Sequence, residues 1–110
     1  AELIDYLHLG GSLVTSAAPY RKVGSKRRGN GFQIDLLIQT EGSMCLTEIK
    51  RQKKIGKEVI GEMDAKVRKI SRPEGVSIRT ALVYDGELNP SVEANGYFDA
   101  LIPFVRLMGV

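Results

Sequence analysis

The chain has little of the chemistry on which disulfide and zinc proteins depend. Its 110 residues include one cysteine and one histidine, which excludes an internal disulfide framework and a zinc site built from these ligands. Tryptophan is absent and aromatic residues make up 6% of the chain, so the sequence offers no stacking surface for unpaired bases. Any metal in this protein would therefore be held by oxygen ligands.

Long hydrophobic runs are also missing. No stretch approaches the about 20 apolar residues of a membrane-spanning helix, and no basic, apolar and small-residue series resembles a secretion signal. We therefore expect no membrane partner and a cytoplasmic location. The length suits one domain, residues 1–110. Because the first residues are helix-like and lack a methionine, we expect a fragment of a longer protein.

The basic residues are concentrated in two clusters. The net charge is +3, and ten of the sixteen lysines and arginines lie between positions 21 and 57. Such clustering favours a partner that carries phosphates. We expect nucleic acid to contact Lys26, Arg27 and Arg28 of the first cluster and Lys53 and Lys54 of the second.

Hydrophobic periodicity predicts an α/β domain with the element order α-β-β-β-α-β. The turn Glu41-Gly42 is expected to join two central strands as a hairpin. A helical crossover from such a hairpin into a further strand gives a mixed sheet with helices on its faces. The expected elements are the end of a helix over 1–9, an edge strand over 12–20, a basic loop over 21–31, the hairpin strands around 32–40 and 43–52, a helix over 57–70, a strand over 78–85, and a tail over 95–109 that could form a strand and a helical turn.

Two carboxylates and an amine stand out within the expected hairpin. A two-residue turn places Asp35 directly opposite Glu48, and Ile34 opposite Ile49 on the other face. Side chains two apart on a strand share a face, so Lys50 lies beside Glu48. Opposed like charges destabilise a sheet, and a divalent cation between them removes that cost. Oxygen ligands of this kind suit Mg²⁺ or Mn²⁺, and the sequence therefore predicts such a site.

An aspartate followed after about a dozen residues by Glu-x-Lys on a hydrophobic strand resembles the PD-(D/E)XK nuclease superfamily. "GNGFQIDLLI", "CLTEIK" and "RTALVYDG" further resemble the nuclease-like domain at the C-terminus of archaeal and bacterial AAA-type ATPases. The likeness runs from about Gly29 to Gly86, with a weaker echo in "NGYFDALIPF".

The resemblance implies a restriction-endonuclease-like three-layer fold and metal-dependent hydrolysis of phosphodiester bonds in DNA. It implies metal ligation by Asp35, Glu48 and the Ile49 carbonyl, with catalytic assistance from Lys50. Relatives often carry a further glutamate on the first helix, for which Glu2 is the candidate here. An attached ATPase domain is implied as a partner.

Two other classes of function remain open. The domain could be a nuclease fold without turnover that anchors an ATPase to DNA through its basic clusters. It could also be a protein-interaction domain whose exposed helix or tail packs against an ATPase or a second copy of itself. Cleavage assays, salt-dependent binding and sizing distinguish the three.

Overall fold

The computed structural model describes residues 14–22 and 31–107. Within them, a mixed sheet has the strand order β1-β2-β3-β4-β5, and the expected α/β class is confirmed. The helix expected over 1–9 and its Glu2 lie outside the described residues. The strands are β1 (Val14–Lys22), β2 (Phe32–Thr40), β3 (Ser43–Ile55), β4 (Ser77–Leu88) and β5 (Ala100–Pro103), and the helices are α2 (Glu58–Lys69), α3 (Pro90–Asn95) and α4 (Phe104–Leu107).

The β2–β3 hairpin has the predicted turn and the predicted register. Leu37 pairs with Leu46 across the two antiparallel strands. At the turn, the Thr40 hydroxyl oxygen accepts a hydrogen bond from the Ser43 main-chain N–H at 3.1 Å. This contact secures the chain where it reverses, so the register follows from local sequence.

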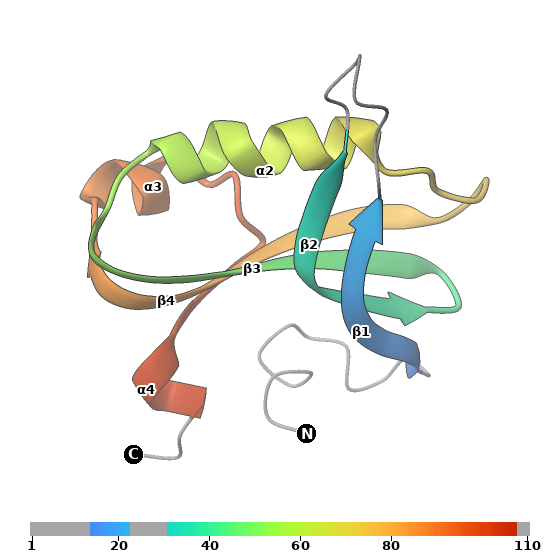
Figure 1. Ribbon diagram of the computed structural model, residues 1–110, viewed down its shortest axis with the longest axis horizontal. Coiled ribbons are helices and arrows are strands. Elements are labelled where there is room, and N and C mark those ends of the chain that lie inside the picture. Colours follow the sequence, from blue (N-terminus) through green and yellow to red (C-terminus); the bar gives the residue numbers. More distant parts are fainter. Residues whose placement is uncertain (1–13, 23–30, 108–110) are drawn as a thin grey trace.

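A β-bulge interrupts β2 close to Asp35. Ala18 of β1 pairs with Leu37 and Tyr20 with Ile34, so three steps along β2 match two along β1. The described β2–β3 pairing ends at Leu36. In Figure 1 the beginning of β2 rises steeply away from β3, whereas its end runs alongside it.

The bulge overturns one expected pair. Ile34 was predicted to face Ile49, but Ile34 is fully buried in the same core as Leu37, whereas Ile49 is 41% exposed. Strict alternation would send residues three apart to opposite faces of the sheet. The extra residue in β2 reverses the alternation between Ile34 and Leu37, and periodicity alone did not reveal it.

Helix α2 connects β3 to β4, and these two strands are parallel, as a helical crossover requires. Its buried residues Val59 and Met63, one turn apart, face the sheet. The main core between α2 and the sheet includes Ile34, Leu37, Leu46, Leu82, Val59 and Met63, and Figure 1 shows α2 lying across this face. The other face carries a smaller cluster of Ile38, Cys45, Ala81, Val83 and Ile102, against which Phe104 and Leu107 of α4 pack.

The second half of β3 contains another irregularity. Arg51 pairs with Asp85 and Lys54 with Glu87, so β3 has one residue more than β4 in this interval. Opposite the extra residue, Gly86 adopts a φ of 139°. A Cβ added there would lie 1.7 Å from a main-chain oxygen of β3, so this close approach requires glycine.

The chain after β4 contains more structure than expected. The tail forms the anticipated strand (β5) and helical turn (α4), whereas α3, which was not predicted, lies ahead of the tail between β4 and β5. The Asn89 side chain caps α3 by accepting a hydrogen bond from the Ser91 N–H at 2.9 Å, and Pro90 follows at the start of the helix. No helix in the described ranges is long and apolar enough to cross a membrane.

Candidate functional site

The bulge gives Asp35 a specific partner on β3. The Asp35 carboxylate accepts a hydrogen bond through Oδ2 from the Ile49 main-chain N–H at 2.8 Å. This contact lies beyond Leu36, the last residue of β2 in the described pairing with β3. The Ile49 N–H of β3 thus donates to an aspartate side chain, whereas elsewhere in the ladder such an N–H donates to a main-chain carbonyl. This hydrogen bond links the two strands where they begin to separate, and it sets the carboxylate beside Glu48.

Glu48 is an almost fully buried acid, with 6% of its side chain exposed. Burial raises the pKa of its carboxyl above the ordinary value, and the neighbouring Asp35 adds to this rise through its charge and a side-chain hydrogen bond. The ammonium group of Lys66, which contacts Glu48 Oε1, acts in the opposite direction. The net direction is upward, so negative charge at this position is incompletely compensated.

Lys50 lies on the same face of β3 as Glu48, as predicted. Both side chains meet α2, because Glu48 contacts Lys66 and the Lys50 ammonium lies 3.1 Å from Glu62 Oε2. The lysine side chain is 27% exposed. The Lys50 side chain is therefore partly exposed to solvent, whereas the Glu48 side chain is enclosed.

The four charges Glu48, Lys50, Glu62 and Lys66 form a crossed quartet between β3 and α2. Two residues along a strand advance by about 6.6 Å, and four residues along a helix by about 6 Å. Because α2 folds back over β3, the later strand residue meets the earlier helix residue. Each strand charge therefore lies against an opposite charge on the helix.

Neither Glu62 nor Lys66 was identified from the sequence. The available signal was the pairing of Glu-x-Lys on a strand with Glu-x-x-x-Lys on the following helix. These spacings match when the two elements pack antiparallel. Hydrophobic periodicity indicates which side of the helix packs on the core, but it does not show which charged flank lies beside the sheet.

The oxygen atoms that Asp35 and Glu48 provide are chemically suited to a magnesium or manganese ion. Asp35 and Glu48 supply hard carboxylate oxygens, and Mg²⁺ commonly binds one or two carboxylates while keeping several waters. Within residues 14–22 and 31–107, no group of three or more His, Cys, Asp or Glu side chains is arranged to hold a metal. The ligands available in this part of the chain are therefore the two acids and main-chain oxygens such as that of Ile49.

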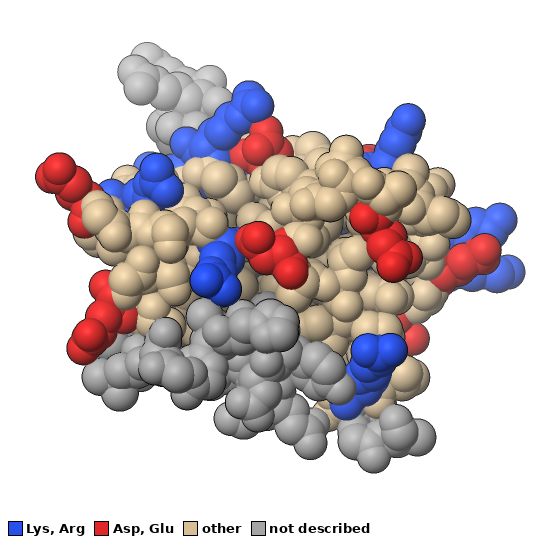
Figure 2. Space-filling model, turned by 180° about the vertical axis from the view of Figure 1, so that it is seen from behind, with Lys and Arg blue, Asp and Glu red and all other residues tan. Residues whose placement is uncertain are grey.

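The residues expected to contact nucleic acid are only partly described. Lys53 and Lys54 are exposed in the last part of β3, which continues to Ile55 before α2 begins. The predicted contacts Lys26, Arg27 and Arg28 lie outside the described residues. On the face shown in Figure 2, the described basic and acidic side chains are interspersed. This face therefore presents no patch of a single sign among the described residues.

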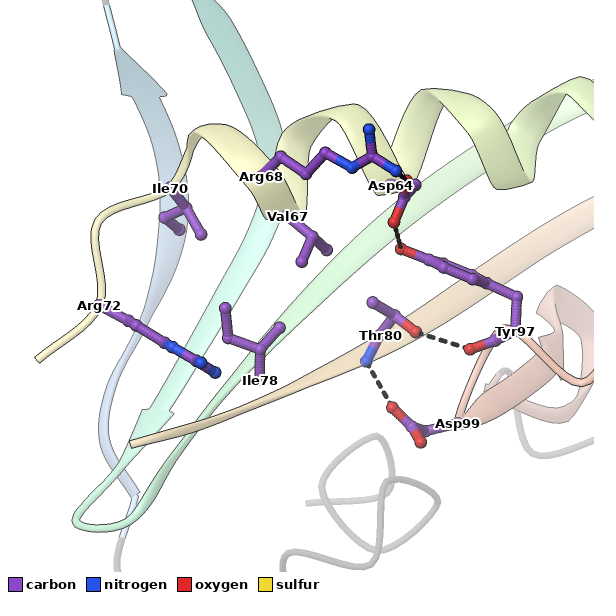
Figure 3. A pocket seen from close by; sticks show the side chains of 9 residues that line it. All are labelled: Asp64, Val67, Arg68, Ile70, Arg72, Ile78, Thr80, Tyr97 and Asp99. Carbon is purple, nitrogen blue, oxygen red and sulfur yellow. Dashed lines mark hydrogen bonds and ion pairs between the residues drawn. The ribbon is translucent and has the colours of Figure 1, made fainter. Parts of the chain in front are cut away.

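A separate open pocket lies between α2, β4 and the segment before β5 (Figure 3). Asp64 contacts Arg68 at 2.8 Å and accepts from the Tyr97 hydroxyl at 3.4 Å, and Asp99 accepts from the Thr80 N–H at 2.8 Å. Its two carboxylates thus have donors within the protein, as Asp35 and Glu48 also do. Burial, reinforced by Asp64, raises the pKa of Tyr97 to about 12. The pocket is lined by Asp64, Val67, Arg68, Ile70, Arg72, Ile78, Thr80, Tyr97 and Asp99.

No known family, curated protein or solved structure matches this chain in the three comparisons made.

Proposed function

We propose that this chain is a restriction-endonuclease-like nuclease domain that hydrolyses phosphodiester bonds in DNA with Mg²⁺ or Mn²⁺. The observation that carries the proposal is the buried Glu48 carboxylate beside Asp35, with Lys50 on the same strand face. A carboxylate whose pKa is raised by burial and by a second acid is stabilised in its charged form by an added cation.

Each residue has a distinct role in this proposal. Asp35 and Glu48 would hold the ion, together with the Ile49 carbonyl. The bound ion would polarise a phosphoryl oxygen and acidify a coordinated water. Lys50, whose side chain is partly exposed, would orient the attacking water or stabilise negative charge on the phosphate.

Support for a DNA substrate and an attached ATPase comes from the sequence. The exposed Lys53 and Lys54 extend β3 beyond the acids and suit contacts to phosphates. The motif resemblance includes β2, β3, α2 and most of β4. The proposed three-layer fold agrees with α2 on one face of the sheet and α4 packed on the other.

The proposal is tested by incubating the protein with supercoiled and single-stranded DNA in the presence of Mn²⁺. The wild type should nick or degrade DNA, and Glu48→Gln, which keeps the shape but not the charge, should not. Glu93→Gln on α3 is a matched control that makes the same change at an exposed glutamate. Equal cleavage by the wild type and Glu48→Gln would show that the assignment is wrong.

A second candidate is a DNA-binding module without turnover. It is favoured by the crossed quartet, in which Glu48 and Lys50 already have partners on α2. DNA binding that persists without metal and weakens steeply with added salt, together with no cleavage under any divalent ion, would select this candidate.

A further inference from the structure

Lys66 lies where it would compete with a metal ion. Its ammonium group contacts Oε1 of Glu48, and the Glu48 side chain is 6% exposed. An enclosed carboxylate has little room for two cations at once, and their mutual repulsion is strong where water is scarce. A divalent ion that binds Glu48 would therefore meet an ammonium group already in place.

The lysine can leave without unfolding the helix. The core contacts of α2 are made by its buried residues Val59 and Met63. Lys66 itself is 24% exposed and has a flexible four-carbon stem. Rotation of the side chain alone can carry its charge from Glu48 to solvent or towards a bound anion.

We propose, on the basis of the function proposed above, that Lys66 is a displaceable internal cation that holds Glu48 when no metal is bound. Divalent metal binds after the Lys66 ammonium leaves, so this lysine lowers metal affinity. It also stabilises the metal-free fold, because without Lys66 the Glu48 carboxylate would be buried with no cationic partner on α2.

The experiment measures Mn²⁺ binding by calorimetry at a mildly alkaline pH, together with thermal melts without metal. Lys66→Met removes the ammonium group and retains the aliphatic stem. If the Glu48 contact is occupied about nine-tenths of the time, removing it should lower the dissociation constant about tenfold. The same variant should melt at a lower temperature than wild type without metal.

Lys69→Met is the matched control, since it removes an equal charge from an exposed position on the same helix. It should leave the dissociation constant within about twofold of wild type. Lys66→Gln, which can still donate a hydrogen bond to Glu48, provides a second variant if Lys66→Met does not fold.

The outcomes separate this proposal from the proposed function. Displacement is supported if the Lys66 variants bind Mn²⁺ more tightly than wild type and Lys69→Met does not. The same holds if the Lys66 variants bind and wild type does not bind detectably. Equal affinities in wild type and both Lys66 variants would overturn displacement and leave the metal site standing. An equal gain in Lys69→Met would also overturn it, because general charge would then explain the effect. Absence of Mn²⁺ binding in all of these proteins would overturn both proposals.

Discussion

Asp35 is expected to serve both the fold and the metal site, and two substitutions separate these roles. Asp35→Ala removes the acceptor of the 2.8 Å hydrogen bond from the Ile49 N–H. Asp35→Asn retains an oxygen that can accept this bond but removes the negative charge. The two variants therefore share the loss of charge and differ in the hydrogen bond.

The magnitude follows from the surroundings of this bond. A hydrogen bond in a partly exposed position contributes about 1 kcal/mol to the free energy of unfolding. For a domain of this size, that corresponds to a melting temperature about 4–8 °C lower for Asp35→Ala than for Asp35→Asn, because both variants equally lose the repulsion with Glu48 and only the alanine lacks the hydrogen bond. Asp35→Asn should melt close to wild type, because a weaker neutral hydrogen bond is offset by relief of repulsion with Glu48.

The stability gained from Mn²⁺ should separate wild type from both Asp35 variants. At a Mn²⁺ concentration one hundred times the dissociation constant, wild type should gain about 2.7 kcal/mol of stability. Both Asp35 variants should lose most of this gain, because each lacks the carboxylate. Thermal melts with and without Mn²⁺ measure both effects. Equal melting temperatures for Asp35→Ala and Asp35→Asn without metal would refute the structural role, and a full Mn²⁺ response in Asp35→Asn would refute the role as a ligand.

Three further predictions concern other parts of the fold. In denaturant melts, Gly86→Ala should lower the free energy of unfolding by at least about 3 kcal/mol, since it adds a clash to a backbone conformation that suits glycine. Gly42→Ala is the control, and it should be tolerated because a Cβ at Gly42 would enter open space. In a spectrophotometric titration, the phenol of Tyr97 should ionise at about pH 12 and this component should vanish in Tyr97→Phe. Because the unfolded phenol loses its proton near its ordinary pKa of 10.0, the stability from this group should be intact below that pH and decline as pH rises towards about 12. Replacing Lys53 and Lys54 together by alanine should reduce the slope of log affinity for DNA against log salt by up to about 2, and an unchanged slope would show that these lysines do not contact phosphates.

Local patterns were sufficient for most of the framework. Alternation on both sides of Glu41-Gly42 predicted the hairpin and its register near the turn, because a two-residue turn leaves little freedom in pairing. Pro19 indicated an edge strand, and β1 does lie at one end of the sheet. The helix α3 escaped notice because a six-residue element shows no periodicity. Its signals are the capping Asn89, Pro90 and the left-handed Gly96 that ends it.

The sequence by itself determined which residues could be ligands and that Glu48 and Lys50 share one face of a strand, because alternation along a strand is a local property of the backbone. Only the tertiary structure decided how Asp35 reaches them. The bulge in β2 depends on pairing with β1 and on burial of Ile34, and both involve residues distant in the chain. The contact between Lys66 and Glu48 likewise depends on how α2 packs across the sheet. The charges of the site could therefore be read from the sequence, whereas their partners required the fold.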